Sequence, residues 1–124
     1  MTTSDDPYEL AAILATPDRG ALYSGLSVLV STAVDGGRCG ALATFGALEL
    51  LNDPDLGAAA PTATFGRSLT ELRATALELE NLTVWACSAS VETWGLRADP
   101  PLAGVMSTPR FLRETAGARR FIHV

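Results

Sequence analysis

The chain has 124 residues, of which 48% are hydrophobic, and a formal net charge of −5. This length suits one domain with a single buried core. Its nine basic residues are scattered and form no cationic patch for nucleic acid. The longest uncharged stretch, 20–34, is too short and too rich in hydroxyl residues to span a membrane. The polar, acidic start of the chain shows no export signal, so we expect a cytoplasmic protein with reduced cysteines.

Apolar segments that indicate strands alternate with helical patterns along the sequence. We expect residues 1–7 to be a disordered leader and 8–124 to form a single domain. The expected strands are 8–15, 38–45, 82–86, 102–106 and 120–124. The expected helices are 17–34, 46–52, 68–80, 88–94 and 109–116. This alternation predicts an α/β fold: a three-layer flavodoxin-like or Rossmann-like sandwich with a five-stranded parallel sheet of order 2-1-3-4-5.

Local signals mark where several helices begin. Thr16 and Thr108 each precede a proline, which predicts an N-cap followed by proline at the first helical position. Ser68 and Glu71 have the spacing of a capping box. Residues 53–64, rich in proline, glycine and alanine, predict a loop of a length that is either mobile or functional.

The helix expected over 17–34 is apolar on nearly every side. No charged residue lies between Arg19 and Asp35, and Val28 and Val34 lie off the stripe that would face the sheet. A helix of this kind is usually buried on two sides. We therefore expect this helix to form the interface of a homo-oligomer, and the mean hydropathy of +0.22 is consistent with covered apolar surface.

Cys87 follows the apolar segment 82–86, at the carboxyl end of the third expected strand. In a parallel sheet, ligands and catalytic groups gather at this edge, because the next helices begin there with unpaired N–H groups. Such groups favour the thiolate, the nucleophilic form of cysteine. Ser88 or Ser90 can cap the helix that follows, and Gly95 fits its left-handed end. The alternative is that Cys87 is a core thiol that packs like a small apolar side chain.

The residues around Cys87 resemble a known signature. The stretch Trp85-Ala-Cys-Ser-Ala-Ser-Val-Glu-Thr-Trp-Gly95 resembles the Ala-Cys-x-x-Ser-Met-x-x-x-Gly pattern of the DsrE/DsrF-like sulfur-relay family, which includes peroxiredoxin-like members. Val91 stands where the pattern has methionine. Residues 41–46 and 102–108 are similar to two further stretches of that family. The resemblance implies the same fold and strand order, a trimer or hexamer, and a Cys87 that takes sulfur from a donor protein as a persulfide and passes it to an acceptor.

We expect the pocket beside Cys87 to be formed by residues at the same edge of the sheet. Three threonines each close an expected strand there, and the other candidates belong to the motif stretches. The expected pocket residues are Thr16, Thr44, Phe45, Ser88, Ser90, Trp94 and Thr108. The threonines have a simpler alternative role as N-caps, and Trp94 has one in core packing.

Other candidate groups predict no further chemistry. Cys39 opens the second expected strand, roughly 16 Å from Cys87 along the strand direction, which is too far for a disulfide. We expect it to be structural, which leaves a thiol peroxidase without a resolving cysteine. His123 is the only histidine, so we expect no metal site. No glycine-rich phosphate loop follows the first strand, so we expect no nucleotide or flavin cofactor.

The sequence thus predicts a sulfur-relay protein, or sulfurtransferase, in which Cys87 is the nucleophile. The alternative is a non-catalytic oligomeric module that binds a small ligand or a partner protein. The reactivity of Cys87 relative to Cys39 distinguishes them, because a relay thiol reacts in the native protein and a packed thiol reacts only on unfolding.

Overall fold

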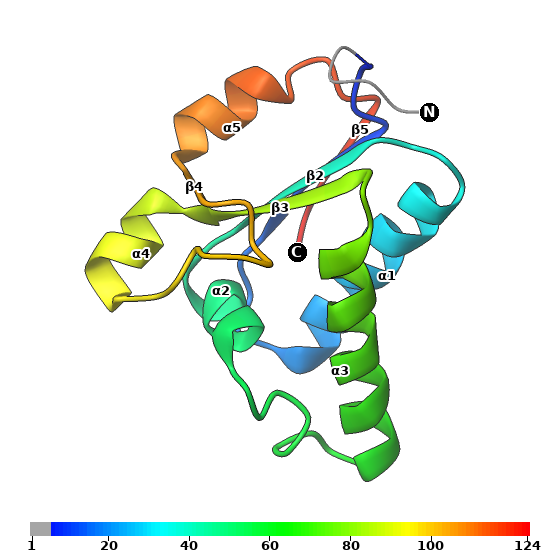
Figure 1. Cartoon of the computed structure of the whole chain (residues 1–124), viewed down its shortest axis with the longest axis vertical. Coiled ribbons are helices and arrows are strands. Elements are labelled where there is room, and N and C mark those ends of the chain that lie inside the picture. The colour runs from blue at the N-terminus through cyan, green and yellow to red at the C-terminus, as the bar shows by residue number, and fades with distance from the viewer. Residues whose placement is uncertain (1–5) are drawn as a thin grey trace.

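A computed structural model describes residues 6–124 of the chain (Figure 1). The strands are β1 (Leu10–Leu14), β2 (Cys39–Ala43), β3 (Leu82–Cys87), β4 (Val105–Met106) and β5 (Arg120–His123). The helices are α1 (Arg19–Val34), α2 (Phe45–Asn52), α3 (Ala63–Glu78), α4 (Ser88–Trp94) and α5 (Thr108–Glu114). The predicted α/β class with a five-stranded parallel sheet is confirmed. Of the leader expected over 1–7, residues 1–5 lie outside the described residues, and the Asp6 carbonyl accepts a hydrogen bond from Arg38.

The strand order is β4-β3-β2-β1-β5, so the expected order 2-1-3-4-5 was wrong. The difference lies in β2 and β5. β2 pairs with both β1 and β3 and has all five of its residues buried, and β5 pairs with β1 rather than with β4. Its small apolar sequence, Cys-Gly-Ala-Leu-Ala, suits a strand between two neighbours rather than the edge position that the expected order gave it. Cys87 on β3 consequently lies between β2 and β4, away from β1.

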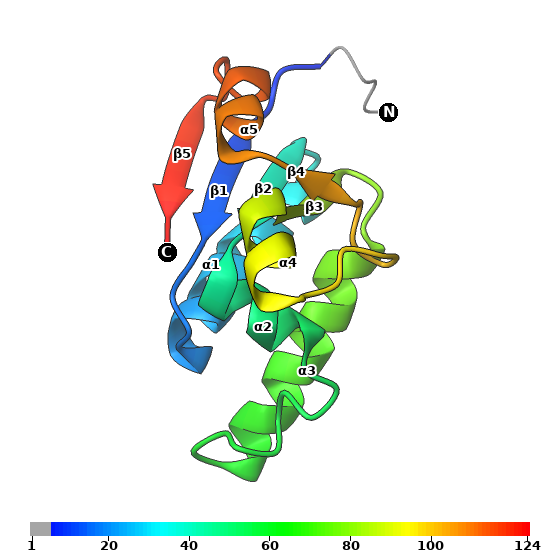
Figure 2. The same ribbon diagram turned by 90° about the vertical axis from the view of Figure 1, so that its left-hand side faces the viewer.

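The helices divide unequally between the two faces of the sheet. α1 and α3 lie side by side across one face, and α5 lies across the other (Figure 1). α2 and α4 lie together at the carboxyl end of the strands (Figure 2). The larger hydrophobic core fills the space between the sheet and α1, α2 and α3. The smaller cluster, on the α5 side, consists of Ala11, Leu42, Cys87, Met106 and Phe111.

Two helices begin near, but not at, the expected N-caps, because several capping residues stand close together in the sequence. The Asp18 carboxylate caps α1 by accepting a backbone N–H of the first turn at 2.8 Å, and Thr16 lies outside the helix. The Ser107 hydroxyl, rather than Thr108, caps α5 and accepts a first-turn N–H at 3.3 Å. Either residue type makes a good cap, so local sequence could not choose between them.

α3 begins earlier than expected, and α4 begins without a side-chain cap. The Thr62 hydroxyl accepts a first-turn N–H of α3 at 3.0 Å, which places Ser68 of the expected capping box inside the helix. The N-cap position of α4 is Cys87 itself, so the expected serine cap of α4 was wrong. The expected end of α4 is confirmed, because Gly95 has a φ of +65° in the left-handed region.

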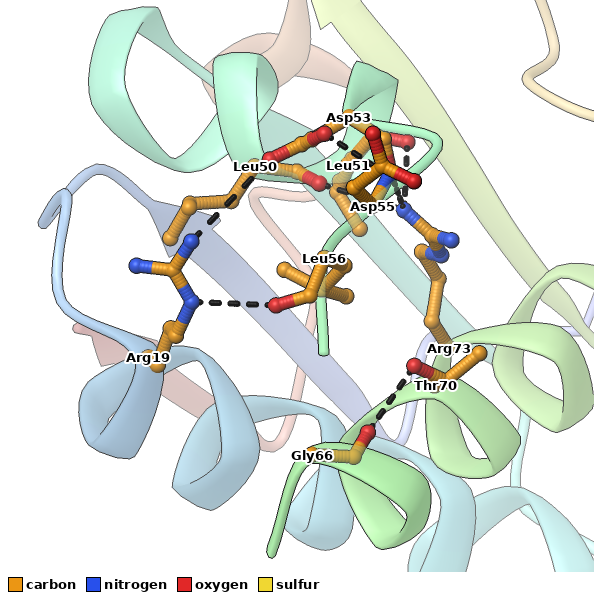
Figure 3. Close-up of polar contacts among 9 residues, drawn as sticks. All are labelled: Arg19, Leu50, Leu51, Asp53, Asp55, Leu56, Gly66, Thr70 and Arg73. Atoms are coloured by element: carbon orange, nitrogen blue, oxygen red, sulfur yellow. Dashed lines mark hydrogen bonds and ion pairs between the residues drawn. The ribbon is translucent and has the colours of Figure 1, made fainter. Parts of the chain in front are cut away.

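The connection between α2 and α3 is fastened to the fold by two arginine side chains (Figure 3). Arg73 donates hydrogen bonds to the carbonyl oxygens of Leu50 and Asp53. From α1, Arg19 donates to the carbonyl of Leu56 at 3.0 Å, and the Leu56 side chain is fully buried. This loop, which the sequence left as mobile or functional, is therefore anchored to the fold through Leu56 and the two arginines, while most of its other residues are exposed.

Part of the apolar surface of α1 is used within the chain. Tyr23 of α1 contacts Phe65 of α3, with ring centroids 5.5 Å apart. Val28 and Val34 stay exposed, at 46% and 69%. The oligomer interface expected on α1 remains a prediction that rests on these two valines. Neither α1 nor any other helix within residues 6–124 combines the length and apolar character needed to cross a membrane.

Candidate functional site

Cys87 is the last residue of β3, at the junction with α4 (Figure 2). In the sheet it is paired with Met106 of β4. Its side chain is 4% exposed and belongs to the cluster that contains Met106 and Phe111 of α5. The sulfur is therefore enclosed on one side by apolar side chains, at the edge of the sheet where α4 begins.

Hydrogen-bond donors surround the Cys87 sulfur. The Thr108 hydroxyl oxygen lies 3.8 Å from it. Although α4 has no side-chain capping hydrogen bond, the backbone N–H groups of Ser90 and Ala89 and the Ser90 hydroxyl favour the thiolate form of Cys87. Burial raises the pKa of the Cys87 thiol, but these donors together outweigh burial and hold the pKa below its ordinary value. The site therefore favours a thiolate, which is the nucleophilic form of the side chain.

Ser90 connects this thiol to α2. The Ser90 side chain is fully buried, and its oxygen accepts the backbone N–H of Phe45 at 2.7 Å. The Phe45 ring meets Trp94 of α4 edge to face, with ring centroids 4.9 Å apart. With Thr108 at the start of α5, the site is thus formed by three connections, from β2 to α2, from β3 to α4 and from β4 to α5.

The remaining expected pocket residues have other places. Ser88 follows Cys87 directly and is partly buried. The Thr44 hydroxyl lies 3.5 Å from the Leu14 carbonyl and holds the end of β2 to β1. Thr16 is exposed beyond β1, and β2 separates β1 from β3, so about 10 Å lies between those two strands. The expected residues that hydrogen bonds and ring contacts join to Cys87 are Phe45, Ser90, Trp94 and Thr108.

Part of the site could not be found from side-chain identity. The N–H groups of Ala89 and Phe45 act through the backbone, so the side chains at these positions do not reveal them. Met106 and Phe111 enclose the sulfur and were not expected, because an apolar residue beside a site gives the same sequence signal as any core residue. Phe45 has a φ of +34°, in the left-handed region that a residue with a side chain rarely adopts.

Cys39 lies at the opposite, amino-terminal edge of the sheet, and both cysteines are free. Its sulfur lies 3.6 Å from the Gly37 carbonyl oxygen and 3.7 Å from that of Leu29. Burial, with the nearby charge of Glu9, raises the pKa of the Cys39 thiol to about 11. It is therefore a protonated thiol at neutral pH.

Within residues 6–124, no three His, Cys, Asp or Glu side chains gather as metal ligands, and His123 on β5 is exposed.

Comparisons with known proteins bear on the fold. No family model matches the sequence, and no curated protein matches it. Among solved structures, the crystal structure of the YchN protein from E. coli is similar, with a TM-score of 0.68 over 94% of this chain and 99% of that chain. The two sequences are 10% identical, so the likeness shows the fold alone. This chain therefore has an α/β fold like that of YchN, and the chemistry of its site must be argued from its own residues.

Proposed function

We propose that this protein is a sulfur carrier of the DsrE/DsrF-like type, which holds sulfur as a persulfide on Cys87. The observation that carries the proposal is the position and acidity of the Cys87 thiol. It lies at the carboxyl end of a parallel strand, and hydrogen-bond donors around it lower its pKa. YchN belongs to the family whose signature the sequence resembles around Cys87, so fold and motif support the same proposal.

The proposed reaction consists of two displacements at sulfur. The Cys87 thiolate attacks the outer sulfur of a donor persulfide, an S–S bond forms to Cys87, and the donor's S–S bond breaks. The donor leaves as a thiolate with the electron pair of the broken bond, and the outer sulfur keeps its proton. An acceptor thiolate then attacks that outer sulfur, and Cys87 leaves as a thiolate, so neither step has a net oxidation. Donors that lower the pKa of Cys87 assist both steps, because the thiolate is first the nucleophile and then the leaving group.

Partner proteins are part of this proposal, because Cys87 needs a donor and an acceptor of sulfur. The elements around the site carry exposed apolar side chains, namely Trp94 of α4, Val105 of β4 and Leu112 of α5. Exposed aromatic and aliphatic groups beside a site suit contact with another protein. A homo-oligomer, trimer or hexamer, in a reducing cytoplasm belongs to the same proposal, and the exposed valines of α1 support it.

The burial of Cys87 favours a second candidate, a non-catalytic module that binds a small ligand or a partner protein. With 4% of the side chain exposed, a reagent reaches the sulfur only when neighbouring side chains move. In that case Cys87 is a core thiol, and its hydrogen bonds serve to pack α4 against the sheet.

Intact-protein mass spectrometry after incubation with a cysteine desulfurase and free cysteine tests the proposal. The variants are Cys87→Ser and, as the matched control, Cys39→Ser. A one-sulfur adduct on the wild type and on Cys39→Ser, lost in Cys87→Ser, supports the relay. If no adduct forms on the wild type, or if it survives Cys87→Ser, the relay is rejected and the binding module replaces it.

A further inference from the structure

The two polar residues that are buried within residues 6–124, Ser90 and Thr115, make different kinds of hydrogen bond. The Thr115 hydroxyl donates to the carbonyl of Phe111 in its own helix at 2.7 Å, a local bond common in helices. The Ser90 oxygen instead accepts the N–H of Phe45, which belongs to another element and lies 45 positions away in sequence. Ser90 is therefore used to connect two parts of the fold.

The direction of that bond decides where the Ser90 proton points. A serine hydroxyl carries one proton and has lone pairs that accept. Because the Phe45 N–H occupies the oxygen as a donor, the hydroxyl proton remains available for an acceptor. The Cys87 sulfur lies three positions earlier, at the N-cap of the same helix, and the Ser90 hydroxyl favours its thiolate form. Hydrogen bonds in series polarise one another, so the Phe45 N–H strengthens the donation from Ser90 to the sulfur.

Phe45 holds a backbone conformation that its surroundings enforce. Within the described residues it is the one non-glycine residue with a positive φ. The next residue, Gly46, packs so closely on Pro17 that a Cβ there would lie 2.4 Å from the Pro17 Cβ. On the other side, the Phe45 ring is held by Trp94. Left-handed backbone in a residue with a side chain persists where the structure over-determines it, and such positions cluster at functional sites.

We propose that Phe45 is a positioning residue for Cys87, whose left-handed backbone directs the N–H that fixes the Ser90 hydroxyl as a donor to the sulfur. Ser90 acts on the Cys87 sulfur at the N-cap of its own helix, and Phe45 acts through Ser90. The Phe45 ring serves to hold this backbone in place against α4. The benefit to sulfur transfer rests on the proposed function, whereas the effect on the thiol does not depend on it.

Alkylation of Cys87 by iodoacetamide across a range of pH, followed by peptide mass spectrometry, measures the thiolate without any sulfur transfer. Ser90→Ala removes the donor, so we expect alkylation at pH 7 to slow about threefold as the midpoint of the pH profile rises. The limiting rate at high pH stays at the wild-type value, because access to the sulfur is unchanged. Thr115→Val removes the other buried hydroxyl and is the matched control, with the wild-type profile expected.

Two substitutions at Phe45 separate the backbone from the ring. Phe45→Gly and Phe45→Val both lose the contact with Trp94, but glycine adopts a positive φ readily and valine does not. We expect the midpoint of the pH profile of Cys87 alkylation to stay at the wild-type pH in Phe45→Gly and to rise in Phe45→Val. Equal profiles for these two variants, or a wild-type profile in Ser90→Ala, would overturn the proposal. If Ser90→Ala does not fold, the Phe45 pair decides by itself.

The two proposals can fail separately. If the pH profile of Cys87 alkylation changes in the variants as expected but the protein takes up no sulfur, the relay is rejected and the positioning role of Phe45 is kept. Sulfur uptake on Cys87 together with a wild-type profile in Ser90→Ala and Phe45→Val keeps the relay and rejects the positioning role.

Discussion

Cys39 and Cys87 are both buried and free, yet they lie at opposite ends of one parallel sheet and have opposite acidities. Around Cys39 the nearest polar atoms are the carbonyl oxygens of Leu29 and Gly37, and its pKa is raised to about 11. Around Cys87 they are N–H and hydroxyl donors, and its pKa is lowered. Burial raises the pKa of both thiols, but only around Cys87 do hydrogen-bond donors outweigh it, so these donors distinguish the reactive thiol from the structural one.

The contrast follows from the common direction of the strands. At the amino ends of parallel strands the preceding helices finish, and their last carbonyl groups are unpaired. At the carboxyl ends the next helices begin, with unpaired N–H groups. Cys39 lies against the Leu29 carbonyl of α1 and the Gly37 carbonyl of the turn after it, whereas Cys87 lies at the start of α4, whose first N–H groups favour its thiolate. A thiol at the carboxyl edge is thus predisposed to ionise.

The largest expected effect of this contrast is on thiol reactivity. With a pKa of about 11, Cys39 is a thiolate in about one molecule in ten thousand at pH 7, against about one in a hundred for an ordinary value of 9.0. Because the pKa of Cys87 is lowered, we expect iodoacetamide to alkylate it at least roughly a hundredfold faster than Cys39 in the native protein. A quenched time course analysed by peptide mass spectrometry gives both rates. Comparable rates would show that access, and not acidity, controls both thiols.

The next effect is on stability in alkali, where the two thiols act in opposite directions. The stabilisation from Cys39 is complete below pH 9 and is lost as the pH rises through about 11, a loss of about 3 kcal/mol. The stabilisation from Cys87 is present above pH 9 and is lost as the pH falls through its lowered pKa. We expect urea unfolding between pH 8 and pH 11 to show a flatter loss of free energy in Cys39→Ala and a steeper loss in Cys87→Ala. Parallel curves for the two variants would contradict the assigned acidities.

The placement of both cysteines was predictable, but the order of the strands was not. The expected strands 38–45 and 82–86 correspond to β2 and β3, and the residue order placed Cys39 at the start of one and Cys87 at the end of the other. The alternation of strands and helices fixes a parallel sheet, yet it leaves open to which side each crossover moves. The small residues of β2 were the available sign that this strand lies inside the sheet.

The error in strand order explains what was missed at the site. Ser90 was expected as a pocket residue and, with Ser88, as a possible cap for α4, because local sequence reports contacts within one turn of helix. Its hydrogen bond to Phe45 requires β2 and β3 to be neighbours, and the expected order placed β1 between them. The side chains of the site were therefore found from the motif, whereas the connection between them depends on the topology.

The low reactivity of the Cys39 thiol also depends on the turn after α1, which the Asn81 side chain stabilises by hydrogen bonds. Its amide donates to the carbonyls of Ala33 at 2.8 Å and Gly37 at 2.9 Å. Asn81→Ala loses both bonds, so we expect the free energy of unfolding to fall by about 1–2 kcal/mol. We also expect Cys39 to alkylate faster, because Gly37 is one of its neighbours. Urea unfolding and peptide mass spectrometry measure the two effects.

Asn52→Ala is the matched control for Asn81→Ala. Asn52 exchanges hydrogen bonds with the backbone of Arg97 at 2.7 and 3.3 Å, far along the chain from Cys39. The Asn52→Ala substitution should lower the free energy of unfolding without accelerating alkylation of Cys39. Equal acceleration in both variants would mean that Cys39 reacts through global unfolding, and the local role of Asn81 would be wrong.

The smallest expected effect is at Thr108, whose hydroxyl lies 3.8 Å from the Cys87 sulfur. Thr108→Val replaces that hydroxyl by a methyl group of similar size, so one donor is lost while the packing is kept. We expect Cys87 to alkylate about two- to threefold more slowly at pH 7 and at the wild-type rate at high pH. Thr70→Val, on α3, removes a hydroxyl that bonds within its own helix and should change neither rate. A rate that falls equally at every pH would mean that valine blocks access, and the acidity of Cys87 would then rest on Ser90 and the backbone of α4.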